Sequence, residues 1–292
     1  MCPVKRVLPL LLVLGLAGIG LSACLLPRAK EEKREPGAAY VALGDSYSAA
    51  PYIGTLDGND SCFRSRNNYP HLLAEAKDLE LTDVSCSAAT TDATDGEQVT
   101  PQQRRLAPQL DALGPTTRLV TVGIGANDFN LIGRIITTCV QIARTATGPS
   151  PCTALDAAAG PRSIESRLKD VQANVTRVLQ DVQAKAPDAQ VVMVGYPQIF
   201  PDTTTGCDDL PLADGDLPLA RRFNEGLNAA VQAAATAAGA EYLDVFSATD
   251  GHGICSDDPW IAGKNVEGKG FAYHPYAKEQ EVVAGLLEKV VD

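Results

Sequence analysis

Short apolar segments that alternate with helical segments constrain the fold of this chain more than any other feature. Five of them have the length and composition of β-strands, and each leads into a helical pattern or into a loop that precedes one. This alternation is typical of a parallel sheet with helices packed against it. The expected strands span residues 39–43, 81–86, 118–124, 190–195 and 241–245.

The composition of these segments supports the same fold class. Residues 118–124 are nearly all apolar, as expected for a strand that is covered on both faces. The helix expected over 163–185 carries one apolar stripe. The sequence therefore predicts a three-layer α/β/α domain with a five-stranded parallel sheet, and nothing marks a domain boundary after residue 38. Other helices are expected at 69–78, 106–113, 217–238 and 274–291, with helix followed by loop over 135–147.

The first 38 residues have the pattern of an export signal and a tether. Lys5 and Arg6 precede an apolar run that is too short and wrongly flanked for a membrane span. Leu21-Ser22-Ala23-Cys24 then resembles a bacterial lipobox, which implies lipidation of Cys24 and cleavage before it. An ordinary signal peptide with an unrelated cysteine is the alternative. We expect a signal peptide at 1–23, a lipidated tether at 24–38 and a folded domain at 39–292.

Cysteine usage agrees with export. Six cysteines remain beyond Cys24, and an even number in an exported chain indicates three disulfides, although six cysteines allow 15 pairings. The absence of a Cys-x-x-Cys pair, together with only three histidines, argues against a structural zinc site. We expect no metal and no other cofactor, and a formal net charge of -11 argues against a nucleic-acid partner. The six are Cys62, Cys86, Cys139, Cys152, Cys207 and Cys255.

Four positions carry the groups that acyl transfer requires. Ser46 follows the first expected strand and offers a hydroxyl, which needs a base to remove its proton. His274, at the start of the last expected helix, can be that base. The Asn127 amide and the backbone N–H groups of Ser46 and Ala88 are candidate oxyanion donors, each worth on the order of 3 kcal/mol. Gly-Asp-Ser alone is also a common turn sequence, so the conjunction carries the argument.

Three motifs in this order resemble the first, third and fifth blocks of the SGNH (GDSL) hydrolase family. They are Gly44-Asp45-Ser46, Gly125-x-Asn127-Asp128 and His274-Pro275. The six cysteines, Cys86-Ser87 and the stretch from Cys255 to Trp260 resemble the disulfide-bonded, secreted actinobacterial lipase/esterase branch. The resemblance implies a flavodoxin-like sheet, hydrolysis of carboxylic esters and no metal. It also implies sequential disulfides: Cys62–Cys86, Cys139–Cys152 and Cys207–Cys255.

Two positions depart from the family pattern. Ala88 stands where the second block has Gly, and its Cβ narrows the space beside the donor N–H. Phe271 stands three residues before His274, where the family has Asp. Some members of this branch resemble a Ser-His dyad in which a backbone carbonyl at this point orients the imidazole. That resemblance implies that the Phe271 carbonyl oxygen accepts from Nδ1–H of His274. The alternative orienting groups are carboxylates of the preceding loop: Asp250, Asp257 or Asp258.

Other polar residues have structural interpretations. His71 lies in an expected helix and His252 in a glycine-flanked loop, so neither is the expected base. Asp45 and Asp128 are expected to organise their loops by hydrogen bonds. Trp260 is expected either to line an acyl pocket or to fill a loop.

The sequence thus predicts an exported serine esterase or lipase that forms an acyl-enzyme on Ser46. We expect it to act as a monomer on small-molecule or lipid esters, and to be anchored to the extracytoplasmic face of the cell membrane through Cys24 or released. Carbohydrate O-deacetylation and phospholipid acyl hydrolysis at the same site are alternatives. A non-catalytic binding lipoprotein is a further alternative, which the missing acid at position 271 favours and the presence of Ser46, Asn127 and His274 opposes.

Overall fold

The computed structural model describes residues 39–58 and 61–291, so the expected signal peptide and tether lie outside the described residues. One parallel sheet has the strand order β2-β1-β5-β6-β7. The strands are β1 (Ala39–Gly44), β2 (Glu80–Asp83), β5 (Thr117–Gly123), β6 (Gln190–Val194) and β7 (Glu241–Leu243), with a small antiparallel pair, β3 (Gln98–Val99) and β4 (Arg105–Leu106). The predicted five-stranded flavodoxin-like sheet is confirmed.

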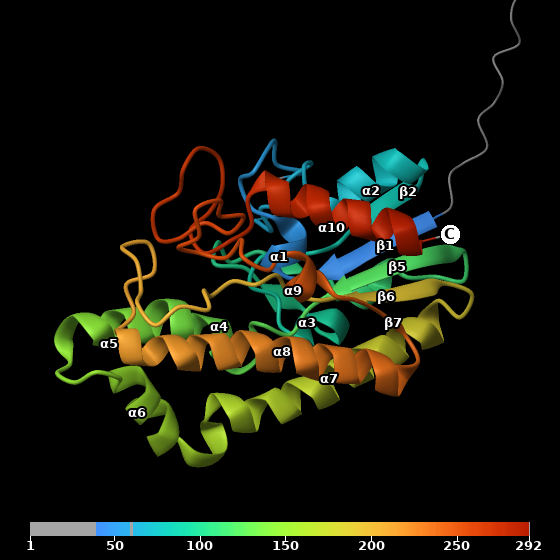
Figure 1. Ribbon diagram of the computed structural model, residues 1–292. Coiled ribbons are helices and arrows are strands. Elements are labelled where there is room, and N and C mark those ends of the chain that lie inside the picture. The colour runs from blue at the N-terminus through green and yellow to red at the C-terminus, as the bar shows by residue number, and fades with distance from the viewer. Residues whose placement is uncertain (1–38, 59–60, 292) are drawn as a thin grey trace, which may run out of the picture. The chain divides into compact units, whose positions relative to one another are not determined.

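Helices cover both faces of this sheet (Figure 1). Successive residues of a strand point to opposite faces, so Tyr40 and Ala42 pack with α2 and α10, whereas Val41 and Leu43 pack in the larger core with α7 and α8. The α-helices are α1 (Ser46–Ala49), α2 (Tyr69–Lys77), α3 (Asp92–Asp95), α4 (Leu131–Gly133), α5 (Val140–Thr145), α6 (Pro151–Ala158), α7 (Ile164–Lys185), α8 (Leu217–Ala238), α9 (Val245–Ala248) and α10 (Ala277–Val290).

Tighter and wider helical turns complete the list of elements. Four are 3₁₀ turns and one, η3, is a π turn that leads into α5. They are η1 (Gln109–Ala112), η2 (Asp128–Asn130), η3 (Arg134–Cys139), η4 (Gly160–Arg162) and η5 (Asp214–Asp216).

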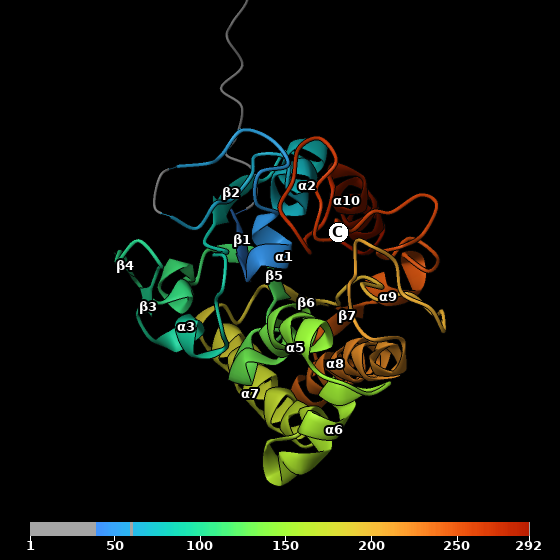
Figure 2. The same ribbon diagram turned by 90° about the vertical axis from the view of Figure 1, so that its left-hand side faces the viewer.

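The strand order determines where a ligand site is expected. In this order the direction of winding reverses between β1 and β5, and ligands bind in the crevice outside the carboxyl ends of the strands at that point. Figure 2 looks at those ends, with α1 near the centre of the view. The loops that follow β1 and β5 begin at Asp45 and Ile124, one residue before the predicted Ser46 and three residues before the predicted Asn127.

Two predicted helices differ from the structure. The helix expected over 106–113 is instead the end of the β3–β4 pair followed by η1, because Pro108 disfavours helical geometry at the residue before it. The helix expected from residue 274 begins at Ala277. Pro275 disfavours helical geometry at the residue before it, and Pro275 pairs with Ile261 as an antiparallel bridge.

The three disulfides join Cys62 to Cys86, Cys139 to Cys152 and Cys207 to Cys255, which confirms the sequential pairing. Removing a native disulfide of this kind typically costs about 2–5 kcal/mol. Among the described residues, no helix has the length and apolar character needed to cross a membrane.

Candidate active site

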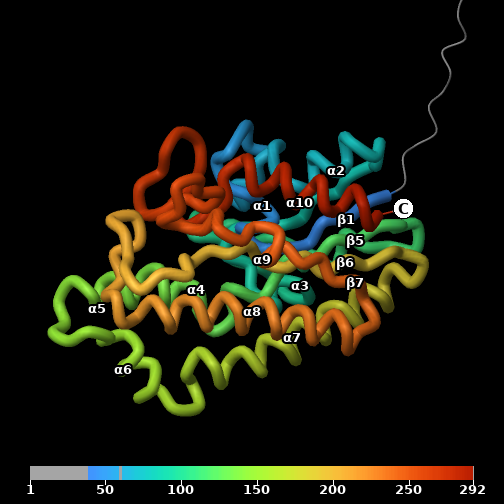
Figure 3. Tube along the Cα trace, in the orientation of Figure 1, coloured from blue at the N-terminus to red at the C-terminus, as the bar shows by residue number. Residues whose placement is uncertain are grey.

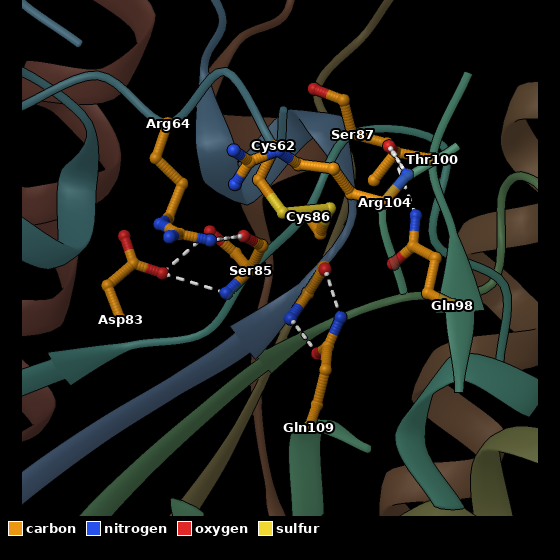
Figure 4. The surroundings of a disulfide bond; sticks show 11 residues. Cys62, Arg64, Asp83, Ser85, Cys86, Ser87, Gln98, Thr100, Arg104 and Gln109 are labelled. Carbon is orange, nitrogen blue, oxygen red and sulfur yellow. Dashed lines mark hydrogen bonds between the residues drawn. A yellow bond between two sulfur atoms is a disulfide. The ribbon is translucent and has the colours of Figure 1, made fainter. Parts of the chain in front are cut away.

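Ser46 lies at the sharp turn between β1 and α1. Gly44 ends the strand, and a Cβ there would lie 2.8 Å from the Gly123 carbonyl oxygen, so only glycine fits between the two strands. The Gln109 side chain accepts from the Gly44 N–H at 2.8 Å and donates to its carbonyl at 3.0 Å (Figure 4). Ser46 is therefore the first residue of α1, and both backbone groups of Gly44, two residues before it, are held by hydrogen bonds.

Asp45 organises this turn, as the sequence predicted. It is fully buried, caps α1 by accepting from the Tyr47 N–H at 2.8 Å, and accepts from the Tyr196 hydroxyl at 2.7 Å. Burial raises the pKa of Asp45 to about 7, although both hydrogen bonds act to lower it. These partners hold the Asp45 side chain next to Ser46 in the chain.

Asn127 follows β5, and its amide is held by one hydrogen bond. Nδ2 donates to the Ala89 carbonyl at 3.0 Å, which leaves its second N–H for another acceptor. The neighbouring Asp128 is buried and accepts from the backbone N–H and the hydroxyl of Thr91, at 2.8 and 2.6 Å. Asn174 of α7 donates to the same carboxylate at 3.1 Å. Asp128 thus ties the Asn127 loop to the Ala88 loop, as a structural carboxylate.

Ala88 has a left-handed backbone conformation, with φ of 64°. This conformation favours glycine and explains physically why the family pattern has Gly here, beyond the loss of space that the sequence suggested. The loop is fixed on both sides of the Cys62–Cys86 disulfide: Arg64 donates to the Ser85 carbonyl and Gln98 to the Ser87 carbonyl (Figure 4).

The predicted role of the Phe271 carbonyl is wrong. Nδ1 of His274 lies 2.7 Å from the Ala272 carbonyl oxygen, and the Phe271 carbonyl instead accepts from the His274 backbone N–H at 3.1 Å. The reason is the left-handed Tyr273, with φ of 62°, which folds the chain so that the carbonyl two residues before the imidazole meets it. Since a carbonyl only accepts, Nδ1 carries the proton and Nε2 has a free lone pair.

Backbone hydrogen bonds and a disulfide hold the segment that carries His274. Ala262 N–H donates to the His274 carbonyl at 2.9 Å, and Tyr276 N–H donates to the Trp260 carbonyl at 2.8 Å. The Tyr47 hydroxyl donates to the Tyr273 carbonyl at 3.0 Å, and the Tyr47 ring stacks on the imidazole with centroids 5.7 Å apart. Burial lowers the pKa of His274 to about 4, despite the opposing effect of the Ala272 carbonyl. The imidazole is therefore neutral at pH 7.

Two cavities meet at these residues, and Ser46, Asn127 and His274 line both. The larger has a volume of about 400 Å³, and Ala88 and an aromatic wall of Tyr52, Phe63 and Phe271 also line it. The Tyr52 and Phe63 rings stack with centroids 5.3 Å apart, and the centroid of the Phe271 ring lies 5.1 Å from that of the His274 imidazole. The smaller, of about 100 Å³, lies between the Asn127 loop and Tyr273. An ester carbonyl near Ser46 thus has space on two sides.

The other histidines, and the carboxylate of Asp258, lie outside both cavities. His71 contacts Asn68 and Asp57, and His252 stacks on Trp260 with centroids 3.6 Å apart. Asp258 contacts His252 and Trp260, so Trp260 packs in a loop and lines neither cavity.

Sequence reasoning missed the groups that connect the loops, chiefly Tyr47, Tyr196 and Gln109. Their only sequence signal is that Tyr47 and Tyr196 follow strands at the carboxyl edge. Among the described residues, no group of three or more His, Cys, Asp or Glu side chains is placed to bind a metal ion.

Comparison with known proteins identifies the family. The GDSL-like Lipase/Acylhydrolase family matches residues 42–281. Lipase 2 of Streptomyces coelicolor is 41% identical over 228 residues, which is 75% of this chain and 74% of the relative. Lipase 1 of the same organism is 32% identical over 266 residues, 90% of each chain.

Two solved structures share the fold. Phospholipase A1 from Streptomyces albidoflavus has a TM-score of 0.70 and 30% identity, covering 87% of this chain and 99% of its own. The extracellular lipase from Streptomyces rimosus has a TM-score of 0.69 and 27% identity, with the same coverage. The family match over residues 42–281 includes the segments that carry Ser46, Asn127 and His274. The chain therefore belongs to the GDSL-like lipase/acylhydrolase (SGNH) family and is a carboxylic ester hydrolase.

Proposed function

We propose that the ester is cleaved through an acyl-enzyme on Ser46, with His274 as the general base. The observation that carries this proposal is that Ser46, Asn127 and His274 line the same two cavities. Nε2 of His274 takes the proton as the Ser46 hydroxyl attacks the ester carbonyl, and the imidazolium returns it to the leaving alcohol. A water activated by the same nitrogen then hydrolyses the acyl-enzyme.

The oxyanion is stabilised by three donors: the backbone N–H groups of Ser46 and Ala88 and the second N–H of the Asn127 amide. The Ala89 carbonyl fixes the orientation of that amide before substrate arrives. Preorganised donors of this kind are usually the largest single contribution to such a reaction, each on the order of 3 kcal/mol.

The Ala272 carbonyl replaces the acid of a triad. It fixes the imidazole in the tautomer that has Nε2 unprotonated, but it adds no charge to stabilise the imidazolium. Losing a triad carboxylate elsewhere costs about 10⁴ in kcat because the wrong tautomer is favoured, a penalty that the carbonyl avoids.

The size of the larger cavity favours an ester with a medium or long acyl chain. A volume of about 400 Å³ with an aromatic wall is suited to a medium or long acyl chain and is far larger than an acetyl group needs. This favours a lipase or phospholipase activity over carbohydrate deacetylation, and the solved phospholipase A1 that resembles this chain supports it. A series of p-nitrophenyl acetate, octanoate and palmitate distinguishes these classes by which ester has the highest kcat/KM.

Export and anchoring belong to the same proposal. Three disulfides indicate an oxidising compartment, and the solved relative from Streptomyces rimosus is an extracellular lipase. We propose that residues 1–23 direct export and that a lipid on Cys24 holds the enzyme, as a monomer, on the extracytoplasmic face. A Cys24→Ser variant is then expected in the medium and the parent chain in the membrane fraction; equal distribution contradicts the anchor.

The central experiment compares ester hydrolysis by the oxidised protein and its Ser46→Ala variant. Ser48→Ala is the matched control, because Ser48 lies in the same short helix but bonds Tyr69 and lines neither cavity. We expect Ser46→Ala to lose essentially all turnover while Ser48→Ala keeps it. Turnover by a folded Ser46→Ala variant would remove Ser46 from the mechanism.

A further inference from the structure

The nucleophile and the oxyanion donor lie on separate loops that follow neighbouring strands. Ser46 follows β1 and Asn127 follows β5, and the backbone register pairs Gly44 with Gly123 where the two strands end. Beyond that pair the Asp45 N–H donates to the Gly123 carbonyl at 2.9 Å. The strands therefore bring the loops together, but the reacting groups lie further along the chain.

Tyr196 joins the two loops at that further point. Its hydroxyl donates to Oδ2 of Asp45 at 2.7 Å and accepts from the Ala126 N–H at 3.1 Å. Asp45 is the residue before Ser46, and Ala126 is the residue before Asn127. One buried oxygen atom is thus shared by the positions that precede the nucleophile and the oxyanion donor.

The direction of both bonds is fixed. The Ala126 N–H can only donate, so the Tyr196 oxygen accepts it and must use its own proton elsewhere. Asp45 is the acceptor of that proton. Burial and the neighbouring Asp45 hold the pKa of Tyr196 well above its usual range, so the hydroxyl keeps its proton.

Tyr196 is itself held in place from α8. Its backbone N–H donates to Oδ1 of Asn228 at 2.9 Å, and Asn224 accepts from the Ile199 N–H and donates to the Pro197 carbonyl. The Tyr196 ring is 1% exposed and packs edge-on against Tyr47, with centroids 5.5 Å apart. A long helix and two buried amides therefore fix the hydroxyl that the two loops share.

We propose that Tyr196 is a positioning residue for ester hydrolysis, whose hydroxyl sets the spacing between the Ser46 nucleophile and the Asn127 oxyanion donor. This rests on the proposed function, because it assigns a role relative to those two groups. Tyr196 lines neither cavity and acts only through Asp45 and Ala126. Misplacement of reacting groups by about 1 Å can cost roughly 10²-fold in rate, so a shared bond of this kind affects kcat more than KM.

The test compares Tyr196→Phe with Tyr40→Phe. Tyr40 is an equally buried tyrosine whose hydroxyl bonds Thr121 at 2.8 Å within the sheet, away from the catalytic loops. Rates are divided by the active sites titrated to completion with a fluorophosphonate, so misfolded molecules do not count. We expect kcat to fall about ten- to hundredfold in Tyr196→Phe with KM within about twofold, and Tyr40→Phe to keep kcat. An equal kcat in the two variants overturns the proposal.

A double-mutant cycle with Asn127→Ala separates positioning from a merely structural role. Once the Asn127 amide is absent, its placement no longer matters, so Tyr196→Phe with Asn127→Ala should lose less than the product of the two single losses. A loss equal to that product overturns the proposal. Asp45→Ala is the second variant if Tyr196→Phe does not fold; it removes the acceptor of the same bond, and wild-type kcat there also overturns the proposal.

Ser46→Ala distinguishes failure of this inference from failure of the proposed function. Full turnover by Ser46→Ala overturns both. An inactive Ser46→Ala beside a Tyr196→Phe variant that behaves like Tyr40→Phe leaves the proposed function standing and removes only the role of Tyr196.

Discussion

The two halves of the site are supported in different ways. Ser46 and Asn127 are carried by neighbouring strands of the parallel sheet, and buried side chains such as Asp45, Tyr196 and Gln109 tie them together. His274 is carried by the irregular segment between α9 and α10, which Figure 3 shows as long loops at the upper left, beyond the carboxyl ends of the strands. Backbone hydrogen bonds, the Tyr47 hydroxyl and the Cys207–Cys255 disulfide hold that segment.

One half of the site is thus positioned by the strand order, and the other half by hydrogen bonds and a disulfide. The strand order alone brings the first half to the switch point between β1 and β5. β7 ends at the same edge of the sheet but lies far from β1 in the strand order, so the position of His274 depends on contacts made by the segment between α9 and α10. The two halves should therefore respond differently to the same kind of change.

The largest effect is expected from removing the proposed general base, His274. His274→Ala should lower kcat by roughly 10³-fold or more, because the hydroxyl of Ser46 then has no group to take its proton. His252→Ala is the matched control, since His252 stacks on Trp260 in the same segment without lining either cavity. Steady-state hydrolysis of p-nitrophenyl octanoate measures both, and near-native activity in His274→Ala would mean that the base is misassigned.

The pH dependence tests the surroundings of the base. The folded pKa of His274 is lowered to about 4 by burial, against an ordinary value of about 6.5, so the base is neutral from about pH 5 upward. We expect kcat/KM to stay level down to about pH 5 and to fall about tenfold per unit as the pH drops below 4. An acid limb between pH 6 and 7 contradicts this, and its loss in Asp45→Asn would assign that limb to Asp45, whose pKa is raised to about 7.

The disulfides sharpen the comparison between the halves. Replacing Cys207 and Cys255 by Ser should loosen the histidine half and lower kcat several-fold, in addition to destabilising the fold by about 2–5 kcal/mol. The same replacement of Cys139 and Cys152 should destabilise comparably but leave kcat unchanged below the unfolding transition, because that pair joins η3 to α6. Thermal unfolding and kcat are measured for both pairs, and an equal kcat in the two would remove the distinction.

The smallest effect is expected at Ala88. Its left-handed φ of 64° costs a non-glycine residue about 1–2 kcal/mol, so Ala88→Gly should raise the free energy of unfolding by up to about 1 kcal/mol, the flexibility of Gly offsetting part of the gain. Ala89→Gly, at a buried position without a positive φ, should destabilise instead. Urea unfolding of both variants checks the sign, and destabilisation by Ala88→Gly would contradict the strain argument.

The parts predicted from the sequence are those that local pattern determines. Five strands and the helices α2, α7 and α8 follow from periodicity, and the cavity residues Ser46, Asn127 and His274 follow from motif order. The failures have local causes that pattern does not reveal: Pro108 stops a helix, and the left-handed Tyr273 presents the Ala272 carbonyl rather than that of Phe271.

The hydrogen bonds that connect the loops could not be predicted from the sequence for another reason. The bonds from Tyr196 to Asp45 and from Gln109 to Gly44 join residues far apart in the chain, and a single sequence holds no record of such pairs. Buried tyrosine and glutamine at these positions look the same as any other core residue.

The most direct test of the account is labelling by a fluorophosphonate, read by mass spectrometry of the peptide that contains Ser46. The account predicts one adduct on Ser46 in the parent protein, none in Ser46→Ala, and much slower labelling in His274→Ala than in His252→Ala. Labelling at another residue, or equal rates in the two histidine variants, would contradict the Ser46–His274 dyad.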